Sequence, residues 1–423
     1  MKKLTALLTA LALILGLCAC SAAATWQEQY DLGVRYLSEG NYQEAIIAFN
    51  AAIEIDPKQV DVYMNLVDAY IALGNLDSAL QTLRDGYAAT GDARLQARID
   101  ELTALAPTPT VGNLTWSLID GTLTISGTGP MEDYEDGTAP WYKDRYSITK
   151  VVIEDGVTSI GNHAFYECNS LTSVDIPDSV TSIGDNAFQF CGSLIGVTIP
   201  DSVTSIKWGA FGSCESLTGI DISVNVTYIG EGAFNNCTNL SSINVASGNA
   251  YYVSVDGILF NAEKTALLAY PAGKIGAYSI PNSVTRIESW SFDGCSGLTR
   301  MTIPNSVTSI GAETFRGCSS LTSVAIPDSV TSIEDGVFWD CSGLIIMTIP
   351  NNITTIKSST FEGCSSLTGI TIPNSVTSIG LRVFYGCDSL KDIYYGGSEA
   401  QWNQIAIDGY NDPLVNATIH YNS

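Results

Sequence analysis

Apolar and polar residues recur along this chain with two different periods. Residues 26–91 repeat every 34 residues, with their apolar positions at helical spacing, and from about residue 148 a 23-residue period takes over. Self-similarity at periods of this length is typical of repeat architectures, in which each unit packs on its neighbours. We therefore expect a multidomain chain, with an all-α repeat region followed by a β-rich solenoid.

The 34-residue unit carries small and aromatic residues in a fixed order. They are Leu32, Gly33, Tyr36, Ala45, Phe49, Ala52 and Pro57 in the first copy, and Tyr63, Leu66, Tyr70, Ala79 and Leu83 in the second. The pattern resembles the tetratricopeptide repeat, which implies two helical pairs. Apolar residues at helical spacing in residues 93–105 indicate one more helix that caps the second pair. The whole helical region is expected over residues 26–105.

The resemblance to tetratricopeptide repeats also implies a groove lined by the first helix of each unit. The lining residues would be Gln27, Tyr30, Val34, Leu37, Asp61, Met64, Asp68 and Ile71. One hypothesis is that a peptide binds there. Because two units make only a short groove, the alternative is that this region is a spacer.

A β-rich segment follows a short linker. Residues 106–112 are rich in Pro and Thr, and prolines at alternate positions prevent a helix and favour an extended chain. Two runs of alternating residues, 114–118 and 122–126, then flank Asp120 and Gly121, a pattern that predicts a hairpin.

The 23-residue unit reads Leu-Thr-Ser-Val-x-Ile-Pro-x-Ser-Val-Thr-Ser-Ile-Gly-x-x-Ala-Phe-x-x-Cys, as in residues 171–191. Its Leu, Val, Ile, Phe and Cys positions should point inward, and one unit cannot bury them without neighbours. The unit resembles the BspA-type leucine-rich repeat of bacterial surface proteins, over about residues 113–423. This resemblance implies a β-rich N-terminal cap over residues 113–147, a solenoid over residues 148–395 and a C-terminal cap over residues 396–423.

One coil of the solenoid departs from the period. Cys237 and Cys295 are 58 residues apart, which is two periods plus twelve residues. Residues 251–260 and 266–270 have the composition of strands, with a turn signal between them. We expect an irregular coil at about residues 246–280, with a hairpin that protrudes from it.

The period is also marked by cysteines. They are Cys168, Cys191, Cys214, Cys237, Cys295, Cys318, Cys341, Cys364 and Cys387. Equivalent residues of stacked coils lie about 4.8 Å apart with parallel side chains, which is beyond the Cβ separation of roughly 3.5–4.5 Å that a disulfide prefers. Zinc would require four converging ligands, usually from Cys-x-x-Cys pairs, which the repeat region lacks. We therefore interpret these residues as buried, reduced thiols and expect no metal.

The N-terminus has the features of an export signal. Two lysines precede an apolar run at residues 4–17, which is shorter than the roughly 18–20 residues of a spanning helix. The sequence Leu-Cys-Ala-Cys at residues 17–20 resembles the bacterial lipobox. It implies a lipoprotein signal peptide at residues 1–19, lipidation of Cys20 and a lipidated tether over residues 20–25. The alternative is an ordinary signal peptide that is cleaved after a residue such as Ala24.

Charge and side-chain inventory exclude several classes of function. The formal net charge is −25, so phosphate backbones would be repelled and we expect no nucleic-acid partner. The two histidines, His163 and His420, fall in positions that we expect on the surface, and no catalytic triad, Walker loop, EF-hand or His-Glu-x-x-His pattern is present. We expect neither an enzyme nor a cofactor.

Singular residues interrupt the regular outward-facing rows of the solenoid. Small polar residues dominate these rows, but Arg300, Ile346 and Tyr394 stand among them in the C-terminal half, and Arg316 and Trp339 occupy variable positions of the turns. Exposed aromatic and Arg residues are common interface anchors, so we predict a ligand-binding surface there. The alternative is that the rows serve only solubility.

Taken together, these features predict a bacterial cell-surface lipoprotein without enzymatic activity. It would be exported, held on the outer face of the cell membrane by a lipid, and monomeric in its ectodomain. The solenoid would act as an adhesion or recognition scaffold for an extracellular protein or glycan. The alternative hypothesis is a structural component of the envelope that associates with copies of itself.

Overall fold

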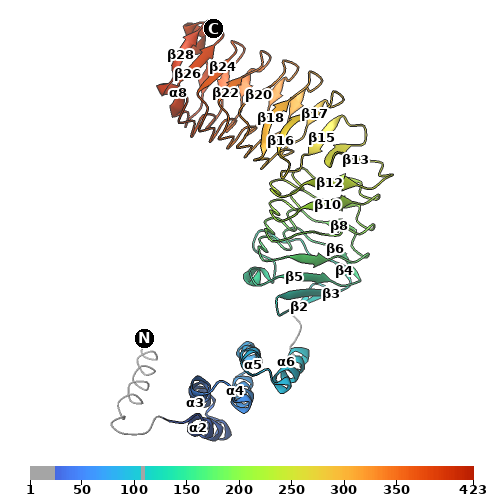
Figure 1. The fold of residues 1–423 in the computed structure, drawn as a ribbon, viewed down its shortest axis with the longest axis vertical. Coiled ribbons are helices and arrows are strands. Elements are labelled where there is room, and N and C mark those ends of the chain that lie inside the picture. Colours follow the sequence, from blue (N-terminus) through green and yellow to red (C-terminus); the bar gives the residue numbers. More distant parts are fainter. Residues whose placement is uncertain (1–23, 106–109) are drawn as a thin grey trace. The chain divides into compact units, whose positions relative to one another are not determined.

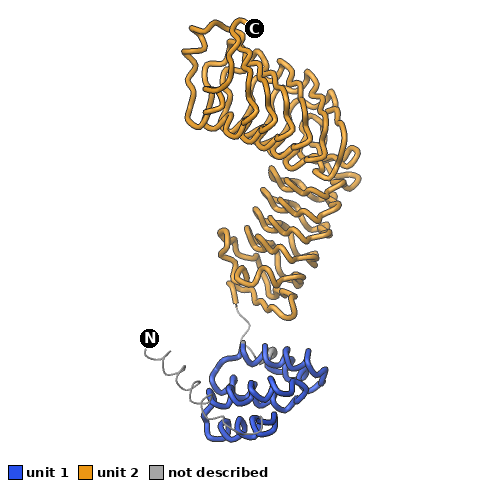
Figure 2. Tube along the Cα trace, turned by 60° about the vertical axis from the view of Figure 1, so that its left-hand side comes forward, with its two compact units in different colours: residues 1–107 blue, residues 108–423 orange. Residues whose placement is uncertain are grey.

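The computed structural model describes residues 24–105 and 110–423. The chain divides into two compact units, the first ending at Pro107 and the second beginning at Thr108 (Figure 2). The expected signal peptide, Cys20 and most of the tether lie outside the described residues, as do residues 106–109 of the linker. Among the helices that are described, none combines the length and apolar character needed to cross a membrane.

The first unit is helical. Its elements are α2 (Trp26–Ser38), α3 (Tyr42–Ile55), α4 (Val60–Ala72), α5 (Leu76–Thr90) and α6 (Ala93–Leu105). A capping box begins α2, since the Thr25 hydroxyl accepts the amide of Glu28 and the Glu28 carboxylate accepts the amide of Thr25. Helices α2 and α3 pack closely at Gly33, where a Cβ atom would lie 2.5 Å from the ring of Phe49. The tetratricopeptide pair is thereby confirmed.

Helix α6 covers the apolar side of the second helical pair. Leu95, Ile99 and Leu102 are buried in one cluster with Tyr63 and Val67 of α4. The apolar spacing in the sequence therefore reflects contacts with the preceding repeat.

In the second unit, each regular coil has two positions for short strands, which form two rows along the stack (Figure 1). The first row contains β5 (Lys150–Ile153), β7 (Ser173–Asp175), β10 (Gly219–Ile222), β12 (Ser242–Val245), β16 (Gly276–Ser279), β18 (Leu298–Thr302), β20 (Val324–Ala325), β22 (Ile346–Thr348), β24 (Gly369–Ile372) and β26 (Asp392–Tyr395). The second row contains β6 (Val157–Ser159), β8 (Ser182–Ile183), β9 (Ser205–Ile206), β11 (Tyr228–Ile229), β15 (Ala266–Ala269), β17 (Arg286–Ile287), β19 (Ser309–Ile310), β21 (Ser332–Ile333), β23 (Thr355–Ile356), β25 (Ser378–Ile379) and β27 (Ala406–Ile407). Equivalent residues of adjacent coils pair in parallel, as Ile370 and Ile393 do. The predicted solenoid of 23-residue repeats is confirmed.

The core of the solenoid contains a ladder of phenylalanine rings. All nine are buried, and neighbouring rings of regular coils lie 5.1–6.0 Å apart. The cysteines are buried and free beside this ladder. From coil to coil, a thiol donates a hydrogen bond to the phenylalanine carbonyl of the preceding coil, as Cys341 does to Phe315 at 3.0 Å. This contact gives the repeated cysteine a structural role in the stack.

Both ends of the ladder are covered. At the N-terminal end lie β1 (Thr110–Val111), β2 (Leu114–Ile119), β3 (Thr122–Gly127), β4 (Gly129–Pro130) and the short helix η1 (Tyr142–Asp144). The β1 strand, within the predicted linker, pairs with β2. Trp141 stacks on Phe165 at 5.9 Å and donates its indole N–H to the carbonyl of Ala164 at 2.7 Å. His163 is half-buried, and both of its ring nitrogens bond to groups of neighbouring coils.

The C-terminal end is closed by α7 (Glu399–Trp402), α8 (Asp412–Asn416) and β28 (Thr418–Tyr421). Trp402 packs edge-on against Tyr395 with ring centroids 5.2 Å apart, which covers the last regular coil. Strand β28 pairs in parallel with β26 and extends the first row.

The irregular coil adds β13 (Tyr252–Val255) and β14 (Ile258–Asn261) to the second row. Strand β13 pairs with β14, β14 pairs with β15, and β15 continues in parallel to β17. The predicted hairpin is present, since β13 and β14 pair antiparallel, but it does not protrude, because it joins the second row of strands. These strands carry too many apolar side chains to project into water: Leu259 belongs to the core of the coils before it, whereas Ile258 and Phe260 belong to the core of the coils after it.

Candidate functional site

The first row of strands carries an exposed apolar patch in its C-terminal half. Ile346 of β22 is 60% exposed and Tyr394 of β26 is 41% exposed. Strand β24 lies between their strands, with Gly369 paired with Ile346, and a ring carbon of Tyr394 lies 3.7 Å from the place where a Cβ atom of Gly369 would be. The missing side chain leaves room for the Tyr394 ring beside Gly369. We call Ile346 and Tyr394 the face patch.

The far edge of the face patch is fixed by the C-terminal strand. The rings of Tyr394 and His420 are stacked, with centroids 4.9 Å apart. His420 in turn lies 2.8 Å from the carboxylate of Asp392 through its Nε2 atom. The Tyr394 ring is therefore held in one orientation, which reduces the entropy that a partner would have to overcome on binding.

The other predicted surface residues lie elsewhere. Arg300 is exposed on β18, separated from β22 by β20. Arg316 and Trp339 lie at the turns after the phenylalanines, where the guanidinium of Arg316 stands 4.6 Å from the centroid of the Trp339 ring. Arg316 also pairs with Glu313 at 3.1 Å. The five residues proposed from the sequence therefore do not form one surface. Ile346 and Tyr394 form the face patch, Arg300 lies on the same row of strands but two strands from Ile346, and Arg316 and Trp339 form a pair at the turns.

In the helical unit, two of the predicted groove residues are engaged by the capping helix. Asp61 forms an ion pair with Arg94 at 3.1 Å, and Asp68 forms one with Arg98 at 3.5 Å. Gln27 bonds to Asp31 within its own helix, and Tyr30 accepts the side-chain amide of Asn65. Val34 is exposed, and Met64 is half-buried. The three helices α2, α4 and α6 together form the surface on which these side chains lie.

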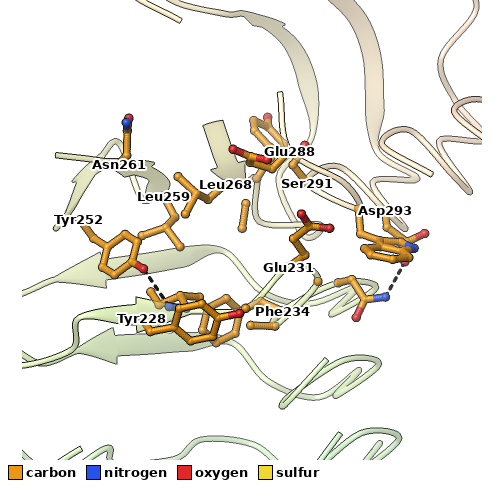
Figure 3. Close-up of a pocket in the computed structure, with 18 of the residues that line it drawn as sticks. Tyr228, Glu231, Phe234, Tyr252, Leu259, Asn261, Leu268, Glu288, Ser291 and Asp293 are labelled. Carbon is orange, nitrogen blue, oxygen red and sulfur yellow. Dashed lines mark hydrogen bonds between the residues drawn. The ribbon is translucent and has the colours of Figure 1, made fainter. Parts of the chain in front are cut away.

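A pocket that the sequence did not predict opens at the irregular coil (Figure 3). Its volume is about 500 Å³, within the range of small-ligand sites. One wall is the coil of β11, with Tyr228 and Phe234. The opposite wall is the coil of β17, with Glu288 and Ser291. The inserted strands β13–β15 form the third wall, with Leu259 among their lining residues.

The pocket exists because two coils diverge like a wedge. At the cysteine turns the coils are in direct contact, since the amide of Asn236 donates to the carbonyl of Asp293 at 3.2 Å. In the second row, the strands β13–β15 are inserted between β11 and β17. The twelve extra residues of the irregular coil therefore widen one side of the stack and leave the other side closed.

Two backbone amides on the β11 wall lack the hydrogen bonds that their counterparts make. In the preceding coil, the amides of Gly209 and Phe211 donate to carbonyls of the next coil. The equivalent amides of Gly232 and Phe234 have no partner among the residues that the structure describes. The carbonyl of Ser291, which corresponds to the acceptor for Phe234, accepts an amide directly after β15 instead.

Polar side chains of the pocket are also unpartnered. Ser291 is only 2% exposed, and its hydroxyl has no hydrogen-bond partner within the described part of the chain. The same holds for the side-chain oxygen of Asn235, whose nitrogen donates to the carboxylate of Asp293 at 3.0 Å. Burial raises the pKa of Asp293 to about 6, against the opposing attraction of Arg316. Unsatisfied buried groups cost free energy unless a ligand or water meets them.

Acidic and aromatic side chains surround these groups. Glu288 pairs with Arg286 at 2.5 Å, whereas the Glu231 carboxylate is exposed and has no ion-pair or hydrogen-bond partner in the described ranges. Tyr228 and Tyr251 are both more than half exposed, at 54% and 53%. The mouth of the pocket therefore offers flat apolar rings next to a carboxylate that is free to accept hydrogen bonds.

The sequence contained a weak signal for this pocket. Four coils before the irregular one have Ala directly before the ladder phenylalanine, and Ser291 is the first hydroxyl residue at that position. Asp293 is likewise the first acid directly after the phenylalanine. Both substitutions sit beside the twelve-residue excess, but their meaning depends on a wedge that only the tertiary structure reveals.

Comparison with known proteins identifies the repeat. The family model of the BspA type leucine rich repeat region matches residues 140–255 and 269–391 in six copies, more than half of the chain. The chain belongs to this family. Its BspA-type solenoid is similar to a leucine rich cell surface protein of Faecalibacterium prausnitzii A2-165, with 31% identity, a TM-score of 0.56, and coverage of 72% of this chain and 98% of that one.

A second solved structure supports the same architecture. A leucine-rich repeat protein from Eubacterium ventriosum ATCC 27560 is 29% identical, with a TM-score of 0.52, and the match covers 68% of this chain and 83% of that chain. Both similar structures are bacterial, and the first is a cell surface protein.

The helical unit has its own relatives. A tetratricopeptide repeat model matches residues 36–99. Tetratricopeptide repeat protein 16 from Homo sapiens is 33% identical over 66 residues, and the protein of that name from Mus musculus is 36% identical over 61 residues. The chain spans about 8% of the length of these curated relatives, so the likeness concerns the repeat alone.

Proposed function

We propose that this protein is a non-enzymatic recognition scaffold on the bacterial cell surface, which binds an extracellular protein or glycan through its solenoid. The observation that carries the proposal is the face patch, since Ile346 is 60% exposed in a row where most other coils have Ser or Gly. Exposed apolar and aromatic residues on the same face of a sheet are typical of interface anchors. The similarity to a leucine rich cell surface protein supports this role.

The proposal includes export and attachment by a lipid on Cys20. The lipobox-like sequence at residues 17–20 supports it, and multiple acyl chains at about 0.8 kcal/mol per buried CH₂ are enough for stable anchoring. Replacing Cys20 by Ala should move the protein from the membrane fraction to the medium or the soluble fraction. Retention of the variant in the membrane fraction would contradict lipidation at this residue.

The recognition proposal is tested by immobilising matrix proteins, glycans and envelope fractions, and measuring binding of the soluble chain from residue 21 onward. Ile346→Ser introduces the residue that Ser173 and Ser323 provide at the same position of other coils, so the fold should tolerate it. We expect at least tenfold weaker binding. The matched control is Ile195→Thr, because Ile195 is 59% exposed in the N-terminal half.

Equal affinity of the wild-type protein and Ile346→Ser for every ligand would contradict the role of the face patch. Sedimentation of the same soluble protein over a range of concentrations addresses the structural alternative. We expect a monomer at all concentrations. Association that Ile346→Ser abolishes would instead identify the face patch as a contact between copies of this chain.

A further inference from the structure

The wedge-shaped pocket at the irregular coil presents unpaired hydrogen-bonding groups of both kinds. The amides of Gly232 and Phe234 are donors without acceptors within the described residues. In the described part of the chain, the side-chain oxygen of Asn235 is an acceptor without a donor, and the unpartnered hydroxyl of Ser291 can both donate and accept. A ligand that fits must therefore donate and accept at closely spaced positions. Hydroxyl groups, which do both, meet this requirement.

Flat rings lie next to these polar groups. Tyr228 and Tyr251 are half-exposed at the mouth, and Trp290 lines the pocket while contacting Trp208 edge-on at 5.8 Å. Aromatic faces of this kind pack against apolar C–H surfaces and keep their polar atoms toward water. The combination suits a molecule whose ring has an apolar face and a polar rim.

The charges of the pocket restrict the ligand further. Figure 3 shows Glu231 reaching from the β11 coil into the opening, with Glu288 and Ser291 on the opposite wall. Arg286 neutralises Glu288, but Glu231 keeps its charge without a partner among the described residues. An anionic ligand would be repelled by Glu231, and a purely cationic ligand would leave both free amides unpaired. A neutral ligand leaves neither conflict.

We propose that this pocket binds a neutral saccharide, with a sugar ring against Tyr251 and its hydroxyl groups bonded to Glu231, Ser291 and the amides of Gly232 and Phe234. The site is distinct from the face patch. It extends the proposed recognition function by adding a small-ligand site to the solenoid, and it stands or falls independently of the face patch.

The experiment uses the soluble protein from residue 21 onward, which retains both compact units. A glycan array with neutral, sialylated and uronic-acid saccharides is followed by calorimetric titration of maltotriose, cellotriose, mannotriose and triacetylchitotriose. We expect saturable binding of at least one neutral trisaccharide. Tyr251→Ala and Glu231→Gln should each weaken it at least tenfold, because they remove the stacking surface and the unpaired carboxylate.

Matched controls separate the pocket from general effects. Tyr385→Ala removes a tyrosine that is 50% exposed in a C-terminal turn, and Glu215→Gln removes an exposed carboxylate in the N-terminal half. Neither should change saccharide affinity by more than about twofold. Ser291→Ala places at this position the residue found in the four preceding coils, so its unfolding temperature should stay close to that of the wild type while its affinity falls.

Three outcomes would overturn the proposal. These are absence of binding to every neutral saccharide at 10 mM, as an order-of-magnitude ceiling for weak sites, binding that the pocket variants leave unchanged, and preferential binding of sialylated or uronic saccharides. Ile346→Ser is included as a further control and should bind the saccharide normally. Loss of protein binding in Ile346→Ser with saccharide binding intact would therefore separate the two sites.

Discussion

Single phenylalanines hold the coils of the solenoid together. Phe315 is fully buried between Phe292 and Phe338, with ring centroids 5.2 and 5.4 Å away. Truncating such a ring removes its buried apolar surface and leaves a cavity that a close-packed stack cannot collapse. We expect Phe315→Ala to lower the free energy of unfolding by about 3–5 kcal/mol, measured by urea denaturation.

The chain offers a matched control for this substitution. Phe190 follows the ladder residue Phe188 by two positions, lies outside the ladder and is 39% exposed. Phe190→Ala should lower the free energy of unfolding by less than about 1 kcal/mol, because the Phe190 side chain buries little apolar surface. If both substitutions had similar effects, the assignment of the ladder register would be wrong.

Asp293 gives the stability of the solenoid a pH dependence. Its pKa of about 6 lies above the ordinary value of 3.8 for an aspartate, because burial disfavours the charged carboxylate. Between those two values the folded protein holds a proton that the unfolded chain releases, so stability falls as the pH rises through this window. Below this window Asp293 is protonated in both the folded and the unfolded state. Above it, the free-energy cost of burying the charged carboxylate is constant. The shift corresponds to about 3 kcal/mol.

Asp293→Asn should remove this contribution, since an amide oxygen can still accept from Asn235. We expect the variant to be more stable than the wild type at pH 7, with the advantage shrinking toward pH 4. The measurement is the urea midpoint of both proteins from pH 4 to 7.5. Parallel pH profiles would contradict the elevated pKa.

At this scale the sequence was a good guide wherever residues repeat. Phe, Cys, Leu and Val recur every 23 residues, and periodicity alone indicates that they face inward. It gave no information on the bonds that His163 makes to Tyr134 and Asn186 of neighbouring coils. A side chain that occurs once has no period, so its environment depends on neighbours that sequence distance does not reveal.

At the scale of the coil, each cysteine thiol is sealed inside the stack. Burial raises the pKa of Cys168, Cys237 and Cys387 to about 12, so these groups remain thiols at neutral pH. Thiolates are the reactive form. We expect none of the nine solenoid cysteines to react with a thiol reagent at pH 8 in the folded protein, and all nine to react after unfolding in denaturant.

The assay should use a protein without Cys18 and Cys20, so that every thiol belongs to the solenoid. Fast reaction of several thiols in the native protein would mean that the coils open readily. Fewer than nine thiols after unfolding would indicate disulfides, in conflict with the free, buried cysteines of the structure.

The irregular coil shows why some elements could be predicted only in part. Strands in residues 251–260 and 266–270 followed from composition, and β13, β14 and β15 lie there. The position of these strands in the sheet did not follow from composition. They join the second row, where β15 pairs with β17. The pairing partner of a strand depends on which edge of a neighbouring sheet is open, and that is determined only when the coils are stacked. The pocket depends on the same pairing and was therefore missed.

At the scale of the whole second unit, the solenoid contains two apolar cores and not one. The first extends from Leu114 to Leu259, and the second from Ile258 to Leu414. Adjacent residues of β14 belong to different cores, so this strand is the wall between them. In repeat proteins the stability of the array depends on the contacts between neighbouring units. At the wedge the phenylalanine ladder is interrupted, and two backbone hydrogen bonds that link other neighbouring coils are missing among the described residues.

We therefore expect the two parts of the solenoid to unfold in separate steps. Hydrogen exchange in increasing urea should reveal this, by comparing amides in residues 150–243 with those in residues 280–395. Phe188→Ala should shift only the exchange of the first range, and Phe315→Ala only that of the second, because each ring belongs to one core.

Strand β14 acts against complete independence, since both cores bury part of it. Its amides should follow whichever core unfolds later, because one remaining face still shields the backbone. A single transition, in which either substitution shifts both ranges equally, would mean that β14 couples the cores as strongly as a regular coil does. In that case the wedge would be a rigid part of the solenoid, and the pocket walls would keep their spacing until the whole unit unfolds.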